Sequence, residues 1–210
     1  MKTYDWKSVA AIVNYGLESQ RNIADLNKVS SEIIQQRNYD EVLNCFQQLL
    51  AVSGEQSEGD LVKKERYLDE LQAELTNHRL EIMKEGILLE QLRHTNEDYT
   101  LVLEEEIKEA ETYLKVGLPA EGRVIDAASR REVLRKRIGE LRTSKTVAES
   151  FSAQLALSEN NCKAMSKRIW NVVVTVIPLL RGRITMETSQ TVIQQAQKIL
   201  RESVELPDKN

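Results

Sequence analysis

The sequence has few of the residues that interrupt helices or favour strands. Only 3 prolines and 8 glycines occur in 210 residues, and the aromatic residues are 2 Trp, 6 Tyr and 2 Phe. Leu, Ile, Glu, Gln, Lys and Arg are common, and these residue types favour helices over strands. The hydrophobic fraction of 41% is large enough to build a core. We therefore expect an all-α protein.

Paired cysteines and long apolar runs are also missing. Cys45 and Cys162 lie far apart without a CxxC motif, so we expect reduced thiols in an intracellular protein. The most apolar run, VVVTVIPLL at 172–180, is far shorter than the about 20 residues that span a bilayer. It predicts a buried helix face. The N-terminus lacks the apolar segment of a signal peptide, which predicts a cytoplasmic protein, with peripheral contact at the inner face of the membrane as the alternative.

Basic residues do not dominate the charge. With 29 basic and 33 acidic side chains the net charge is −4, which disfavours nucleic acid as a partner. The basic run RREVLRKR at 130–137 has no interleaved aromatic residues. We expect it to pair with an acidic helix, and binding of nucleic acid or anionic lipid is the alternative interpretation.

The apolar spacing predicts a series of helices. They cover 6–37, with Gly16 on the apolar face, 40–54 with Asp40 as N-cap, 61–116, 124–156, a helix from Ser158 that Pro178 kinks or ends, and a last stretch from Met186. Gly, Pro and Gly in KVGLPAEGR at 115–123 predict a turn near 117–122.

These helices predict an elongated molecule built around a long antiparallel coiled-coil hairpin. We expect three parts: an N-terminal helical segment at 1–58, the hairpin at 59–156, and C-terminal helices at 157–210. The first and last parts should pack together as a helical bundle at the base of the hairpin.

The 61–116 helix has a heptad seam. One column comprises Leu68, Leu75, Ile82, Leu89, Asn96 and Leu103, and the other comprises Leu71, His78, Glu85, Leu92 and Tyr99. The second column alternates apolar and polar residues, which is typical of a helix that packs within its own chain. Asn96 interrupts the apolar column, and a polar seam residue of this kind specifies helix register or belongs to a functional site.

Charge blocks flank the predicted turn at nearly equal distances. A hairpin centred near Pro119 would place Glu104 opposite about Arg135, and Glu109 or Glu111 opposite about Arg130. Opposite charges across the pair would select orientation and register, although each exposed ion pair contributes only about 0.2–1 kcal/mol.

The residues that could carry chemistry are few. His78 has Glu74 and Glu81 within one helical turn, which is half of a metal site, but no second seam histidine completes a common zinc ligand set. We therefore interpret His78 as a satisfied polar residue, with metal or proton chemistry as the alternative. We interpret Cys45, beside Phe46, as a small hydrophobic residue, with redox chemistry as the alternative. No catalytic or phosphate-binding motif occurs. We expect a protein that is not an enzyme and holds no cofactor or metal.

The segment 67–114 resembles the core of the TelA-like tellurite and toxic-anion resistance family. The matching positions are Glu74, Leu75, His78, Ile82, Leu89, Leu92, Asn96, Tyr99, Leu103 and Ile107. The stretches YGLESQRNI at 15–23 and VIPLL at 176–180 are similar to two further segments of that family, whereas Glu85, Gly86, Arg93 and Glu111 depart from its pattern.

The resemblance implies a bacterial, all-helical stress-resistance protein without an assigned reaction. It also marks Glu74, His78, Asn96 and Tyr99 as a candidate polar cluster on the seam. We expect a scaffold or adaptor that works with other stress-resistance proteins or by self-association. The alternatives are direct detoxification of an oxyanion, which needs a reactive thiol, and a membrane-surface protein in envelope stress that uses 130–145 with 172–180.

Overall fold

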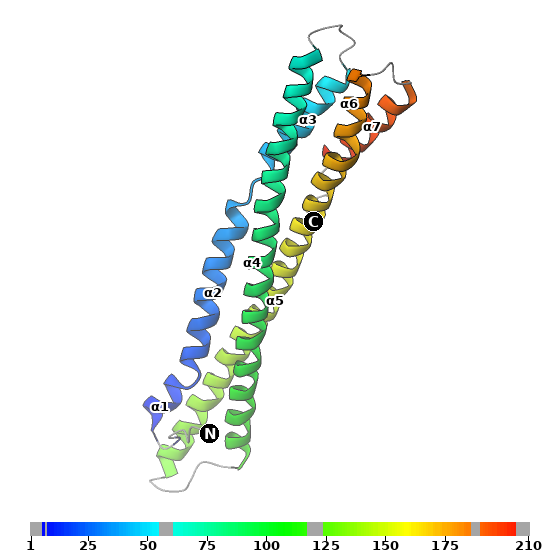
Figure 1. The fold of residues 1–210 in the computed structure, drawn as a ribbon. Coiled ribbons are helices and arrows are strands. Elements are labelled where there is room, and N and C mark those ends of the chain that lie inside the picture. Colours follow the sequence, from blue (N-terminus) through cyan, green and yellow to red (C-terminus); the bar gives the residue numbers. More distant parts are fainter. Residues whose placement is uncertain (1–5, 7, 55–60, 117–123, 186–189, 205–210) are drawn as a thin grey trace. The chain divides into compact units, whose positions relative to one another are not determined.

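The computed structural model describes residues 6, 8–54, 61–116, 124–185 and 190–204, and among them it has helices and no strand. The fold is all-α, as predicted. Its α-helices, labelled in Figure 1, are α1 (Val9–Asn14), α2 (Leu17–Gln36), α3 (Asp40–Gly54), α4 (Leu61–Val116), α5 (Val124–Asn171), α6 (Ile177–Thr185) and α7 (Gln190–Val204). A π-helical turn, η1 (Val172–Val176), joins α5 to α6. The 61–116 helix is found as predicted.

The chain divides into two compact units that share the long helices. Unit 1 comprises Met1–Gln35 and Leu89–Leu157, and unit 2 comprises Gln36–Leu88 and Ser158–Asn210. This division differs from the predicted parts 1–58, 59–156 and 157–210. The N-terminal segment contributes to both units, because α1 and α2 belong to unit 1 whereas α3 belongs to unit 2 and contacts α7.

In unit 1, α4 and α5 pack antiparallel. Contacts join Glu111 to Arg142 and Glu104 to Lys145, and Asn96 contacts Ala148, so numbers rise along α5 as they fall along α4. The apolar core contains Trp6, Ile12, Tyr15, Ile23, Leu103, Ile107, Ala110, Leu134, Ile138, Leu141 and Ala148. The predicted antiparallel pairing of the two long helices is therefore confirmed, while its turn near 117–122 lies outside the described residues.

The predicted helix over 6–37 is interrupted at Gly16. This glycine has a φ of 66°, in the left-handed region that only glycine adopts freely, and it separates α1 from α2. A Cβ atom here would lie 2.8 Å from Cδ2 of Leu141 and 2.9 Å from Oε2 of Glu106. Gly16 therefore permits both a change of chain direction and a close approach to the long helices. It is buried, but the predicted continuous helix through it was wrong.

In unit 2, apolar side chains of several helices form a second core. Its largest fully buried members include Phe46, Leu49, Leu68, Leu75, Ile169 and Ile177. Helix α3 begins at the predicted residue, but Asn38 supplies the cap: its Oδ1 accepts a hydrogen bond from the Asp40 backbone N–H at 2.7 Å. A side-chain acceptor here satisfies a backbone donor that the first turn leaves unpaired.

Helix α5 is longer than predicted, because it continues through 157 to Asn171. The helix also does not end at Pro178. The π-helical turn η1 comes just before the proline, and the Ile177 N–H bonds to the Val172 carbonyl, five residues earlier. Pro178 has no backbone N–H to donate to the preceding turn. In the π-helical turn η1 the backbone N–H groups bond to carbonyls five residues earlier instead of four, and this change occurs where the proline donor is missing. α6 then continues to Thr185.

The heptad seam of α4 is confirmed. All six residues of its first column are buried, Asn96 included. Of the second column, Leu71 is buried and the other four are half-buried.

Candidate functional site

Five side chains of unit 2 that could bind a metal or a proton lie close together on α3 and α4. His78 lies on α4, where its Nε2 is 3.8 Å from Oε1 of Glu74, one turn earlier, and 3.7 Å from Oε2 of Glu41 on α3. The second ring nitrogen, Nδ1, is 3.8 Å from Oε2 of Glu81. Cys45 lies one turn after Glu41 on α3, and ligand atoms of Cys45, Glu74 and His78 all lie within 4.8 Å of one another.

Both thiols of the chain are buried and reduced. Burial, and next the negative charge of Glu74, raise the pKa of Cys45 to about 12. Burial also raises the pKa of Cys162, whose Sγ lies 3.8 Å from the Tyr39 hydroxyl. Because the thiolate is the nucleophile, neither cysteine is activated for attack on an oxidant or an oxyanion.

The sequence indicated His78, Glu74 and Glu81 but missed Cys45 and Glu41. Both missed residues precede His78 by more than thirty positions, and only the packing of α3 on α4 brings them to it. A signal was present: Cys45 shares the predicted apolar face of its helix with Phe46 and Leu49. That pattern predicts that the thiol is buried, but it does not predict which turn of α4 it meets.

The residues of the predicted polar cluster are divided between the two units. Glu74 and His78 belong to unit 2, and Asn96 and Tyr99 belong to unit 1. Asn96 is fully buried, and its Nδ2 donates a hydrogen bond to the Ala148 carbonyl at 2.8 Å. Its Oδ1 finds no hydrogen-bond donor in the described part of the chain. Tyr99 packs against the core of unit 1.

The predicted hairpin charge pairs have a different register. Glu104 forms its ion pair across the helices with Lys145, ten residues beyond Arg135, and a second one with Lys108 on its own helix. Glu109 accepts a hydrogen bond from the Tyr15 hydroxyl at 2.8 Å. Acidic and basic side chains do pair across α4 and α5, but the pairs predicted from a turn centred on Pro119 were wrong.

The basic run at 130–137 is partly buried. Arg130 and Arg137 are both at most 5% exposed. Arg137 donates from Nε to the Tyr15 carbonyl at 2.7 Å and from Nη1 to Glu140 at 2.9 Å. It thereby holds the end of α1 against α5, so part of this run has a structural role.

One face of α4 in unit 2 exposes large apolar side chains. Leu80, Met83 and Ile87 are 48%, 40% and 52% exposed, and their spacing of three and four residues places them on one side of the helix. On α5, Trp170 is half exposed, with the Arg79 guanidinium 4.5 Å from its ring centroid.

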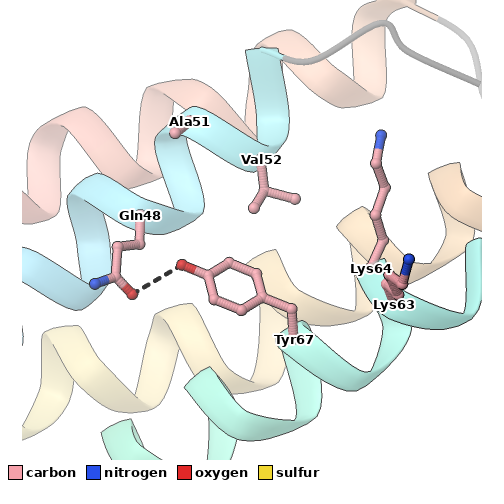
Figure 2. A pocket seen from close by; sticks show the side chains of 6 residues that line it. All are labelled: Gln48, Ala51, Val52, Lys63, Lys64 and Tyr67. Carbon is pink, nitrogen blue, oxygen red and sulfur yellow. Dashed lines mark hydrogen bonds between the residues drawn. The ribbon is translucent and has the colours of Figure 1, made fainter. Parts of the chain in front are cut away.

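A small surface hollow lies between α3 and α4 near the ends of these helices. Figure 2 shows the ring of Tyr67 in it, with the hydroxyl donating a hydrogen bond to Oε1 of Gln48 at 3.0 Å. Lys63 and Lys64 lie at its edge, and Ala51 and Val52 complete the lining. These six residues include neither a nucleophile with its base nor a pair of carboxylates.

The apolar run at 172–180 is mostly buried, as predicted. Val172, Val173, Val176, Ile177 and Leu180 all face the interior of unit 2. None of the helices, as far as they are described, combines the length and apolar character needed to cross a membrane.

Comparison with protein-family models, with curated proteins and with solved structures found no match for this chain.

Proposed function

We propose that this chain is a non-enzymatic bacterial stress-resistance protein of the tellurite and toxic-anion type, which acts as a helical adaptor. Its site of action is the exposed apolar face of α4 formed by Leu80, Met83 and Ile87. The partner is another protein of the resistance system, met in the cytoplasm or at the inner face of the membrane. The resemblance of 67–114 to the TelA-like family supports the resistance role.

The single observation that carries the adaptor role is the exposure of this apolar face. Isolated exposed apolar residues are ordinary, but three on one side of a single helix form a continuous strip. Such i, i+3, i+7 strips are the anchors by which helices dock into apolar grooves. The seam side of α4 is already filled by the core of unit 2, so this strip is available to a second protein.

The alternatives have less support. Detoxification by a thiol needs a reactive cysteine, and both thiols are buried with raised pKa values. A membrane-surface role through 130–145 and 172–180 needs those segments to offer basic and apolar surface, whereas Arg130, Arg137 and most of the apolar run are buried.

The proposal is tested in a bacterium whose own copy of the gene has been deleted. We expect the wild-type gene to restore growth on tellurite, and the variant Leu80→Ser, Met83→Ser, Ile87→Ser to fail although it folds with unchanged helical circular dichroism. A photoreactive residue at position 83 should cross-link the wild-type protein to its partner. A matched control replaces three exposed apolar residues of unit 1, Leu101, Val102 and Val147, by Ser and should restore growth.

Each part of the proposal can fail separately. If deletion leaves tellurite sensitivity unchanged, the resistance role is wrong. If the α4 variant restores growth as well as the control variant does, the apolar face is not the docking site. If a double Cys45→Ser, Cys162→Ser variant that remains folded loses resistance, thiol chemistry replaces the adaptor role.

A further inference from the structure

Two pairs of potential metal ligands face each other across α3 and α4. Glu41 and Cys45 are separated by four residues on α3, and Glu74 and His78 are separated by four residues on α4. Side chains four apart lie on the same side of a helix. The two pairs therefore bring a thiol, an imidazole and the Glu74 carboxylate within 4.8 Å of one another in unit 2, with the Glu41 carboxylate 3.7 Å from the imidazole.

We propose that Cys45, Glu74 and His78 bind a zinc ion, with Glu41 as the fourth ligand. Thiolate sulfur, imidazole nitrogen and carboxylate oxygen are the atoms that Zn²⁺ takes in proteins, usually four in a tetrahedron. A hard oxygen-seeking ion such as Mg²⁺ would not select a thiol. The proposal concerns unit 2 alone and does not depend on the adaptor function.

The spacing of the ligand atoms fits a small tetrahedral ion. Zinc bonds of about 2.0–2.3 Å place neighbouring ligand atoms roughly 3.3–3.7 Å apart. In the structure Nε2 of His78 lies 3.7 Å from Glu41 and 3.8 Å from Glu74. The Cys45 sulfur lies within 4.8 Å of the ligand atoms of Glu74 and His78. Small side-chain rotations that draw these atoms together, with rotation of the exposed Glu41 carboxylate, would complete the shell.

The state of His78 points to a missing ligand. Its Nε2 is fully buried and has no hydrogen-bond partner among the described residues, an arrangement that costs free energy unless the nitrogen is occupied. The other nitrogen, Nδ1, faces Glu81 at 3.8 Å. Metal-binding histidines commonly donate their second N–H to a carboxylate, which fixes the ring, and Glu81 is placed to accept that bond.

The charge of the cluster also favours a cation. Glu41, Glu74 and Glu81 all approach one imidazole. When zinc binds, the Cys45 S–H proton leaves to solvent as the sulfur–zinc bond forms, and the ion offsets the repulsion among thiolate and carboxylates.

The chain provides its own matched controls, because it has two cysteines and two histidines, one of each in the cluster. Cys162 is buried elsewhere in unit 2, and His94 is largely exposed beside Glu97. We would titrate the full-length reduced protein with Co²⁺ as a spectroscopic probe and then displace it with Zn²⁺. We expect one equivalent of Co²⁺ to give a thiolate charge-transfer band that Zn²⁺ abolishes.

Substitutions of single side chains show which of them bind the metal ion. Cys45→Ser should lose the band, and His78→Gln and Glu74→Gln should weaken zinc binding by at least about 100-fold, since even a second-shell loss costs 10–100-fold. Cys162→Ser and His94→Gln should bind as the wild type does. The two α4 variants keep the test valid if Cys45→Ser does not fold. Failure of the folded wild type to bind one equivalent, or unchanged binding in Glu74→Gln and His78→Gln, overturns the proposal.

Discussion

Replacing Asn96 by Asp exchanges one side-chain amide for a carboxyl of nearly the same shape inside the core of unit 1. The native amide is fully buried and donates to the Ala148 carbonyl at 2.8 Å. An ionised carboxylate cannot donate, and its charge would face that carbonyl oxygen without water. A protonated carboxyl can donate and restores the bond. The Asn96→Asp variant should therefore fold with the carboxyl protonated.

The expected loss of stability equals the free energy needed to keep the new carboxyl of the Asn96→Asp variant protonated in the folded state. Burial raises the pKa of the new carboxyl in the folded state, whereas the unfolded chain ionises with the ordinary aspartate pKa. Each pH unit above the ordinary value then costs about 1.4 kcal/mol of folding free energy. Roughly three units separate that value from pH 7, so we expect the variant to lose about 4 kcal/mol at pH 7 and about 1.5 kcal/mol at pH 5. The stability difference from wild type should be greatest at high pH and vanish in acid.

Urea unfolding at both pH values measures this difference, because wild-type Asn96 does not titrate and every other group is shared. Asn77→Asp, at an exposed position of the same helix, serves as the control and should change stability by less than about 0.5 kcal/mol. Equal losses for Asn96→Asp at pH 5 and pH 7, or no loss at either, would refute the buried contact with Ala148.

Three further substitutions test the packing at two glycines and one partly buried ion pair. Gly16→Ala should destabilise unit 1 by about 1–3 kcal/mol in thermal unfolding, because it adds left-handed backbone strain and a Cβ atom 2.8 Å from Leu141. Gly139→Ala has nothing near its added Cβ atom and should stabilise α5 by about 0.5–1 kcal/mol in the same assay. Destabilisation by both substitutions would contradict the difference between the two sites. Glu85→Ala should lower the free energy of unfolding in urea by about 2–4 kcal/mol. The reason is that the Arg37 side chain, only 8% exposed, loses the carboxylate that its Nε contacts at 2.6 Å. A loss below about 1 kcal/mol would show that this ion pair contributes little to stability.

Much of the fold could be predicted because it depends on local patterns. The bounds of α4 follow from a long periodic stretch without proline, and its first seam column is buried at every position. The register of the hairpin could not be predicted in the same way. Ion pairs near the surface, such as half-buried Glu104 with Lys145, are too weak to fix it. Buried contacts that no sequence pattern reveals, among them Asn96 with Ala148, form in one register only.

Only the α4 half of the candidate site could be predicted, because a sequence pattern reveals neighbours on one helix but not contacts between helices. Glu74 and His78 are neighbours on one helix, and their spacing of four residues is visible in the sequence. Cys45 and Glu41 show the same spacing, but on another helix and without any sign of the turn they face. Searching only for a second histidine left out the proposed metal site, to which a cysteine and a glutamate from α3 would contribute.

The mixed second column of the α4 seam explains how the N-terminal segment finds its place. A two-stranded coiled coil would favour apolar residues there, yet His78, Glu85 and Tyr99 interrupt the column. Within unit 2, His78 meets Glu41 of α3, and Glu85 binds Arg37 in the link before that helix. Within unit 1, Tyr99 packs against the core that α1 and α2 help to form. The column is polar where a third chain segment contacts it, so its polar residues are placed to bind that segment within each unit.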